Sequence, residues 1–460
     1  MNIGKFVSIV NGVTKSPSSI PISRIIYEYT RFVSKGDFFW VRDREGNIGK
    51  IKKAIQRGAV GIISPLSLRG RLQEHSHIHY VYVNKSMIKK YCNYHRNQFN
   101  LPVIGITGSA GKTTTKNMVS QILKSQGKVI HTVASVNAVG TAPMYALKIN
   151  SSHRYGVFEM GMKGLGQIRV MGSYLKPTIG IITNIGDAHI GKLGNSIENI
   201  IRAKSEIVGE ISSNGYLILN ADNPYTDRIN VSKFKGKKII YVGIHNKADI
   251  KAYDIQYLNR ATSFKIEYEN NTYSFHVPTI GEHNLYNALA AIATGFILNV
   301  PYSRMKQRLS TFKNAGMRTQ VLRGLNGTTL ISDAYNANPT AAIEGLNTMK
   351  KISKGKPMLA VIGDMSEQGT HTIQGHKKVG KHAADLGIDV VGIGVHGKSV
   401  VDGANSSNNT VNSTYLKNKK AAYQYLRNRF SKDMYVYFKA SRDFRMETLI
   451  RKLTAKRNEQ

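Results

Sequence analysis

The chain contains Leu101-Pro-Val-Ile-Gly-Ile-Thr-Gly-Ser-Ala-Gly-Lys-Thr-Thr-Thr115, an apolar run that leads into a glycine-rich loop. A helix-like stretch, Lys116-Asn-Met-Val-Ser-Gln-Ile-Leu-Lys124, follows directly. A strand, a glycine loop and a helix in this order form a phosphate cradle, because glycines let backbone N–H groups turn toward phosphate oxygens and the helix N-terminus favours an anion. Lys112 is placed to reach the β- and γ-phosphates, and Thr113 to hold a magnesium ion. The stretch predicts a nucleoside triphosphate site.

The glycine spacing of this loop departs from the strict phosphate-loop pattern. That pattern needs a glycine where the chain has Ile106, and the glycines stand at positions 105, 108 and 111. An ordinary glycine turn is therefore the alternative interpretation. The Gly-Lys-Thr run between a strand signal and a helix signal favours the phosphate loop. Its predicted nucleotide-binding residues are Gly108, Ser109, Ala110, Gly111, Lys112, Thr113 and Thr114.

The composition is typical of a soluble globular enzyme, with 41% apolar and 20% charged residues. A chain of 460 residues is long enough for about three domains. No apolar run reaches the ~18–20 residues of a membrane span, and the first residues do not resemble a signal peptide. The lone Cys92 excludes an intramolecular disulfide and an all-cysteine metal cage. We expect a protein of the reducing cytoplasm.

The charge is strongly positive, because 65 Lys and Arg residues stand against 28 Asp and Glu residues and give a formal +37. Such a field attracts anionic substrates, nucleic acid or an acidic membrane surface. The basic residues are spread along the chain in short runs such as Lys235-Gly-Lys-Lys238, and no nucleic-acid-binding motif interrupts them. We interpret the excess as a general surface property and expect no specific nucleic-acid partner.

Residues 1–99 predict a small α/β domain with a helix at 51–57 and strands at 36–41, 59–63 and 80–83. The stretch 89–99 leads into the next domain. Arg31 and Lys35 could meet a phosphate or could equally be solvated surface charges.

Residues 100–313 predict a second α/β domain with a mostly parallel sheet covered on both faces. Its expected strands lie at 156–160, 178–183 and 215–219, and a β-rich insertion is expected between 221 and 280. Functional groups gather at the carboxyl ends of parallel strands. Glu159 and His189 stand at such ends, and Lys204 lies on the helix that follows. Each of the three could be an ordinary surface residue. Beside a phosphate loop, however, the carboxylate of Glu159 is a suitable ligand for Mg²⁺.

The helix predicted from Gly281 onward carries amides at one end. His283, Asn284 and Asn287 are candidates for hydrogen bonds to a base or a ribose.

Residues 314–460 predict a third, Rossmann-like α/β domain with strands at 330–333, 358–362, 389–393 and 434–438. Asp402 to Ser413 is rich in Asn and Ser and predicts a loose loop. Polar clusters follow the strands at 333–339, 363–367 and 439–443.

From about residue 100 to 455 the chain resembles the Mur ligases, most closely the type that adds D-alanyl-D-alanine to a UDP-N-acetylmuramoyl-tripeptide. Thr107-Gly-Ser-Ala-Gly-Lys-Thr-Thr114 looks like the family's phosphate loop, which accounts for the shifted glycine. Asp333-Ala-Tyr-Asn-Ala-Asn-Pro339, Gly363-Asp-Met-Ser-Glu-Gln-Gly369 and Lys439-Ala-Ser-Arg442 look like its C-terminal motifs, with His376. The resemblance implies an enzyme that uses ATP to join an acid to an amine through an acyl phosphate.

The resemblance also implies roles for individual residues. Two magnesium ions are expected, at Thr113, Glu159, His189 and Lys204, with Lys204 N6-carboxylated as in many members of the family. The residues expected to act in catalysis are Lys112, Glu159, His189, Lys204 and Arg318. The nucleotide is expected at the phosphate loop and at His283, Asn284, Asn287, Arg318 and Asp333. The two substrates, a UDP-linked muramoyl peptide or similar acid and an amino acid or dipeptide amine, are expected at Thr30, Arg31, Asn336, Asn338, Ser441 and Arg442.

The resemblance is weaker in the first domain. Tyr29 stands where an aspartate is usual, and the Asp-Gly-His segment expected after Gly36-Asp-Phe-Phe39 is missing. Two alternatives stay open: a Mur ligase paralogue that joins a different acid and amine, and a basic phosphate-loop ATPase that acts on nucleic acid. We expect a monomer.

Overall fold

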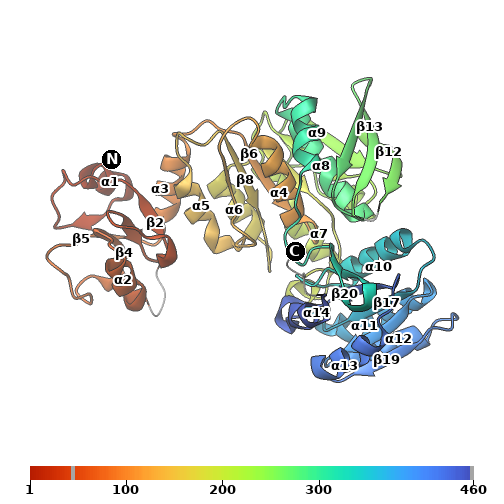
Figure 1. Cartoon of the computed structure of the whole chain (residues 1–460). Helices are drawn as coiled ribbons and strands as arrows, with labels where there is room; N and C mark the ends of the chain where they lie inside the picture. The colour runs from red at the N-terminus through yellow and green to blue at the C-terminus, as the bar shows by residue number, and fades with distance from the viewer. Residues whose placement is uncertain (43–46, 259, 456–460) are drawn as a thin grey trace, which may run out of the picture.

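The computed structural model describes residues 1–42, 47–258 and 260–455. Three β-sheets follow one another along the chain, each with its own helices, and Figure 1 shows the first at the left, the second in the middle and the third at the lower right. The predicted α/β architecture of three domains with mostly parallel sheets is confirmed. The boundaries after residues 99 and 313 stay predictions.

The first sheet has five strands in the order β1-β5-β4-β3-β2, and it is parallel except for β1, which pairs antiparallel with β5. The strands predicted at 36–41, 59–63 and 80–83 are confirmed as β3, β4 and β5, and the helix at 51–57 as α2. Residues 89–99 are largely helical rather than a plain connection. The elements are α1 (Ile3–Val10), β1 (Val13–Thr14), β2 (Ile25–Tyr27), β3 (Phe38–Trp40), α2 (Asn47–Gln56), β4 (Gly61–Pro65), β5 (His79–Val83) and α3 (Met87–Arg96).

The second sheet has nine strands in the order β14-β13-β12-β11-β10-β9-β6-β8-β7. The pairs β12–β13 and β13–β14 are antiparallel, and the other pairs are parallel. The strands expected between residues 221 and 280 are not an insertion, because they continue this sheet from β10 outward. The strands are β6 (Val103–Thr107), β7 (Val129–His131), β8 (Tyr155–Glu159), β9 (Ile179–Ile182), β10 (Tyr216–Asn220), β11 (Lys238–Gly243), β12 (Ile250–Tyr257), β13 (Thr262–Tyr268) and β14 (Asn271–Val277). The helices are α4 (Lys112–Leu123), α5 (Ala142–Lys148), α6 (Gln167–Leu175), α7 (Ile197–Ser205), α8 (Glu282–Ile297) and α9 (Tyr302–Ser310).

The third sheet has six strands in the order β15-β16-β20-β17-β18-β19, with only β15 antiparallel to its neighbour. The loose loop predicted from Asp402 to Ser413 is wrong at both ends, because α12 continues to Asn405 and β19 begins at Ser413. Val400 and Ala404 are buried, and this packing holds the Asn-containing helix end in place. The elements are β15 (Gln320–Arg323), β16 (Thr329–Ser332), α10 (Pro339–Ser353), β17 (Met358–Ile362), α11 (Thr372–Asp385), β18 (Asp389–Ile393), α12 (Gly397–Asn405), β19 (Ser413–Leu416), α13 (Lys419–Arg429), β20 (Tyr435–Lys439) and α14 (Glu447–Leu453).

The first two domains share one apolar core. A single cluster of buried side chains runs from Phe6 and Trp40 through Tyr91 and Cys92 of α3 to Tyr145 of α5. The third domain keeps its apolar clusters largely to itself, on the two faces of its own sheet. Its contacts with the second domain are mainly polar, as the next section describes. No helix within the described residues is long and apolar enough to cross a membrane.

The packing of α4 against α8 supports the helix that follows the phosphate loop. We expect Leu289→Ala, at a fully buried position in the cluster that includes Met118 and Ile122 of α4, to lower the free energy of unfolding by about 2–5 kcal/mol, because it removes buried methyl groups and leaves a cavity. The measurement is urea unfolding followed by circular dichroism. The same substitution at Leu165, which is 47% exposed, is the matched control and should change stability by no more than about 0.5 kcal/mol. Equal losses in the two variants would contradict this assignment of the core.

Candidate active site

The glycine-rich loop joins β6 to α4, and two of its glycines adopt backbone angles that disfavour other residues. Gly108 has φ 147° and Gly111 has φ 79°. A Cβ atom at residue 108 would lie 1.9 Å from Oγ1 of Thr183, and one at residue 111 would lie 2.3 Å from Oδ1 of Asn287. The loop is therefore a specific close-packed conformation rather than an ordinary turn, and it places the N-terminus of α4 at its mouth.

The segment after β9 holds this loop from the side. The backbone N–H of Ala110 donates to Oδ1 of Asn184 at 2.8 Å, and Oγ of Ser109 donates to the carbonyl of Gly186 at 2.8 Å. Nζ of Lys112 donates to the carbonyl of Gly108 at 2.6 Å, so the lysine folds back over the loop. The loop is thus shaped within the protein before any ligand enters.

A carboxylate and a hydroxyl meet at the start of α4. Oγ1 of Thr113 donates to Oε2 of Glu159 at 2.9 Å, and Nδ2 of Asn137 donates to Oε1 at 2.6 Å. Glu159 is the last residue of β8, as the strand-end rule predicts, and it is 3% exposed. Nη2 of Arg318 donates to the same Thr113 hydroxyl at 3.0 Å.

Positive charge exceeds negative charge around Glu159. Burial lowers the pKa of Lys112, an effect that Glu159 opposes and Arg318 reinforces. Lys204 is 2% exposed, and burial together with the positive charge of Lys112 holds the pKa of its amine well below the usual lysine range. No ion pair to Lys204 occurs among the residues that the structure describes. The arrangement therefore favours an anionic ligand at this place.

His189 lies in the loop after β9, and Nδ1 of its ring bonds to Glu367 of the third domain. Burial lowers the pKa of His189, and Lys112 adds to this effect while Glu367 opposes it. The imidazole and the buried amine of Lys204 therefore stand in a common electrostatic environment, although no hydrogen bond joins them in the described residues.

The predicted base-binding helix is α8, and its polar side chains are mostly occupied within the protein. Nδ2 of Asn284 donates to the carbonyl of Ile280 at 2.8 Å, and Oδ1 of Asn287 accepts from Thr115 of α4 at 3.0 Å. Nε2 of His283 contacts Oγ1 of Thr319 at 3.0 Å, while its buried Nδ1 has no partner in the described residues. Asn287 thus supports the phosphate loop from behind.

Arg318 stands on the connection between the second and third domains, and both of its neighbours have left-handed backbone angles. Met317 has φ 59° and Thr319 has φ 49°, which is costly for a β-branched residue. Oδ1 of Asp333 accepts from the backbone N–H of Thr319 at 3.1 Å, and its other oxygen accepts from Tyr437 at 3.1 Å. The predicted nucleotide residue Asp333 therefore fixes the connection that carries Arg318.

The four residues predicted for the amine substrate divide into two pairs. Asn338 caps α10 with its Oδ1, and buried Ser441 accepts from the backbone of Ser366 at 2.7 Å, so both side chains are used by the fold. Asn336 and Arg442 are exposed, and Arg442 pairs with Glu447 at 2.9 Å.

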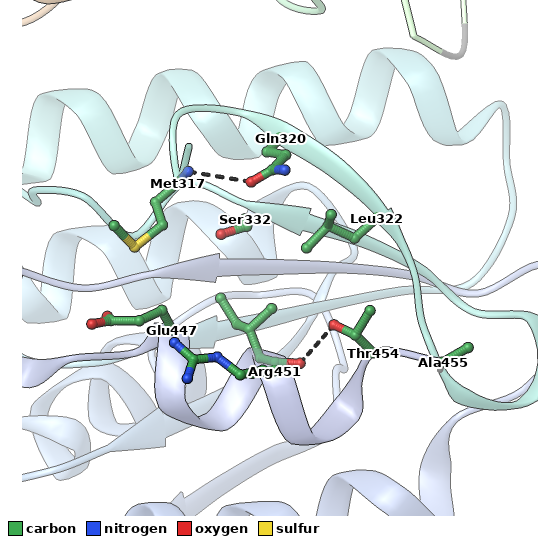
Figure 2. Close-up of a pocket in the computed structure, with 9 residues that line it drawn as sticks. Met317, Gln320, Leu322, Ser332, Glu447, Arg451, Thr454 and Ala455 are labelled. Atoms are coloured by element: carbon green, nitrogen blue, oxygen red, sulfur yellow. Dashed lines mark hydrogen bonds between the residues drawn. The ribbon is translucent and has the colours of Figure 1, made fainter. Parts of the chain in front are cut away.

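Two cavities lie away from the phosphate loop. One, of about 360 Å³, is lined by Tyr29, Thr30 and Arg31 of the first domain and by Gly140 of the second, so the predicted acid-substrate residues do line a cavity at that junction. The other, of about 330 Å³, lies between β15 and α14 and is lined by apolar side chains such as Met317 and Leu322 and by polar ones such as Gln320, Glu447 and Arg451 (Figure 2).

The donor atoms fit one magnesium ion readily and a second only after modification. Thr113 and Glu159 present hard oxygens, which Mg²⁺ prefers. No group of three His, Cys, Asp or Glu side chains that could hold a metal occurs in the described part of the chain. A site at His189 and Lys204 would need the carbamate of the lysine, because an ammonium group repels a cation.

Comparisons with known proteins agree with this geometry. The family model for the Mur ligase middle domain matches residues 106–295, and that for the Mur ligase glutamate ligase domain matches residues 317–442. The UDP-N-acetylmuramoyl-tripeptide–D-alanyl-D-alanine ligase of Bacillus subtilis is 33% identical over 76% of this chain and 75% of its own. The chain belongs to the Mur ligase family. It is therefore an ATP-dependent ligase.

Two further relatives cover almost all of this Mur ligase. The ligase of the same name from Buchnera aphidicola subsp. Baizongia pistaciae is 30% identical over 98% of each chain. A crystal structure of MurF from Acinetobacter baumannii superposes with a TM-score of 0.86 at 27% identity, over 98% of each chain. The first domain, which neither family model covers, is thus matched as well.

The structure adds site residues of this Mur ligase that sequence reasoning missed. Asn137 and Asn184 hold Glu159 and the loop, and Lys116 donates to the carbonyls of Thr132 and Ala134 at 2.8 and 3.0 Å. Asn184 directly follows the predicted strand and Lys116 directly follows the loop, so position alone could have suggested both. Nothing local in the sequence marks Asn137.

Two of the buried lysines, Lys204 and Lys116, predict substitution effects of opposite sign. We expect Lys204→Met to stabilise the protein in buffer depleted of carbon dioxide, because it replaces a buried amine that has no ion pair in the described residues by a similar apolar chain. We expect Lys116→Met to cost about 1–3 kcal/mol, because two carbonyls lose their donor.

The advantage of Lys204→Met also depends on pH. The folded pKa of Lys204 is below its unfolded value, so the unfolded state binds more protons between the two values and stability rises with pH in that window. The gain in Lys204→Met should shrink as pH approaches the usual lysine range. Melting temperatures of both variants across pH are the measurement, and a gain that grows with pH would contradict the burial of an uncharged amine.

Proposed function

We propose that this Mur ligase joins D-alanyl-D-alanine to UDP-N-acetylmuramoyl-tripeptide, the reaction for which its relatives are named. The observation that supports it most is the meeting of two basic side chains, Lys112 and Arg318, with the carboxylate of Glu159 and the hydroxyl of Thr113 at the phosphate loop. A nucleoside triphosphate is the ligand whose charge matches this arrangement.

The reaction needs two transfers, because a carboxylate does not form an amide directly. A carboxylate oxygen of the peptide attacks the γ-phosphorus of ATP, and ADP leaves. The amine then attacks the carbonyl carbon of the acyl phosphate, and inorganic phosphate leaves with the C–O bond electrons. Both steps move negative charge between oxygens, so positioning and charge stabilisation are the main tasks of the protein.

The residues of the phosphate loop position the phosphates of ATP. Backbone N–H groups of the loop bind the phosphates, and Lys112 turns from the carbonyl of Gly108 to the β- and γ-oxygens. Arg318 reaches the same point from the other side, and its Nε is buried without a partner in the described residues, so it has a donor free for a phosphate oxygen. Together they hold the transferring group between two cations.

Thr113 and Glu159 would hold one magnesium ion, and His189 with N6-carboxylated Lys204 would hold a second. Such ions neutralise phosphate charge and polarise the substrate carboxylate. The lowered pKa of Lys204 supports carboxylation, because the neutral amine is the form that attacks carbon dioxide. Asn137 keeps the carboxylate of Glu159 oriented toward Thr113.

The two substrates approach from opposite sides of the second domain. Thr30 and Arg31 line a cavity between the first and second domains that suits the phosphate groups of the acid substrate. Asn336 and Arg442 present their side chains to the amine substrate and its carboxylate, and Asn338 and Ser441 shape the backbone behind them. Tyr29 in the first cavity favours the second candidate, a Mur ligase that takes a different acid.

We propose a working monomer. ATP and a nucleotide-linked peptide as substrates support a cytoplasmic location. Basic residues on the surface then serve no specific nucleic acid.

Phosphate release from ATP should require both substrates. We expect turnover only when UDP-N-acetylmuramoyl-tripeptide and D-alanyl-D-alanine are present together, because the amine attacks only after the carboxylate is activated. Lys204→Ala should lower this rate by about a hundredfold or more, the scale of losing a charge-stabilising group. Stimulation by DNA or RNA, with no dependence on Lys204, would contradict the proposal. A folded, ATP-binding protein without turnover on this pair would favour a different acid substrate.

A further inference from the structure

The third domain touches the second through one carboxylate that no role above requires. Glu367 lies in the segment after β17, and it bonds Nδ1 of His189. Its other oxygen accepts from Nζ of Lys163, in the segment after β8, at 2.7 Å. A residue of the third domain is thus held by two separate loops of the second.

The backbone around this contact is constrained on both sides. His189 has φ 65° and Glu367 has φ 62°, so each partner has the left-handed conformation that residues other than glycine disfavour. The N–H of Gly191 donates to the carbonyl of Glu367 at 3.1 Å. Such strain persists only where surrounding contacts fix it, and it collects at functional sites.

Two glycines let the segments approach closely. A Cβ atom at residue 191 would lie 2.4 Å from the backbone nitrogen of Gly369, and one at residue 369 would lie 2.2 Å from Oδ1 of Asn195. The N–H of Thr370 donates to the same Asn195 oxygen at 3.2 Å. The contact therefore forms only when the third domain is fully docked at this place.

We propose that Glu367 is a positioning residue that links docking of the third domain to the metal side of the active site. A carboxylate on Nδ1 fixes the proton there and leaves the lone pair of His189 on Nε2, to which no hydrogen bond occurs in the described residues. When the third domain leaves, the ring loses its orientation and its tautomer is no longer fixed. The inference rests on the proposed function, because His189 is a metal ligand only there.

The test compares Glu367→Gln with the unaltered enzyme. Glutamine keeps the size of the side chain but removes the charge that holds the Nδ1 proton. We expect the Mg²⁺ concentration for half-maximal turnover to rise about tenfold or more, which is typical of losing a group that orients a metal-binding histidine. We also expect the ¹⁵N spectrum of His189, assigned with His189→Gln, to lose its single Nδ1–H tautomer.

Two further variants separate charge from docking. Asp385→Asn removes a carboxylate that pairs with Lys381 on an exposed face of the same domain, and it should change neither readout. Gly191→Ala keeps Glu367 but blocks the close approach, so it should raise the Mg²⁺ requirement in the same direction. The double variant Gly191→Ala with Glu367→Gln should need little more Mg²⁺ for half-maximal turnover than Glu367→Gln alone.

Unchanged Mg²⁺ requirement and tautomer in a folded Glu367→Gln protein would overturn the proposal, and so would an equal effect of Asp385→Asn. If the unaltered enzyme shows no turnover with the two substrates, the proposed function fails. The ¹⁵N spectrum, and Mn²⁺ binding in the presence of a non-hydrolysable ATP analogue, would still decide the role of Glu367, since neither needs turnover.

Discussion

An imbalance of buried charge organises this molecule. Lys112, Lys116 and Arg318 gather near one carboxylate, Glu159, with Lys204 next to Lys112, and burial lowers the pKa of all three amines. Charges removed from water are stable only when they are paired or hydrogen-bonded. Lys116 satisfies this with two carbonyls, whereas Lys204 does so by losing its proton more readily than an exposed lysine. The excess of basic groups at the phosphate loop suits an anionic ligand.

The two domain junctions differ in their physical character, and this decides which domain is free to move. An unbroken apolar cluster joins the first domain to the second, so separating them would expose buried aromatic rings. The third domain meets the second mainly through hydrogen bonds and ion pairs, at Arg318, His189 and Asn195, with Ile280 and Tyr257 packed against its apolar cluster. Water can replace the polar contacts at small cost. Under the proposed function, opening at this junction would admit ATP and the amine while the cavity at Thr30 and Arg31 keeps its shape.

The sequence allows much of this to be predicted, because strands buried on both faces and a glycine loop leave strong local signals. Glu159 was predicted from its place at a strand end, and that place is confirmed. The sequence identifies Glu367 only as part of a motif, because its partner His189 is 178 residues away in the chain and no local pattern links the two. The loop predicted at Asp402–Ser413 was wrong only at its ends: Asn and Ser favour turns locally, whereas burial of Val400 and Ala404 extends the helix to Asn405. Local sequence patterns do not predict contacts between residues that are far apart in the chain.

Several residues with strained backbone lie near the phosphate loop and at the contact between the second and third domains. Left-handed angles occur at Ala134 beside the Glu159 cluster, at Met317 and Thr319 around Arg318, and at the His189–Glu367 contact. Each such residue raises the free energy of the docked state by about 1–3 kcal/mol unless its neighbours offset it. Any part of this strain that docking of the third domain imposes opposes the docked state. A ligase that must release ADP, phosphate and a large product after every cycle needs a site that closes around its ligands and reopens once they have reacted.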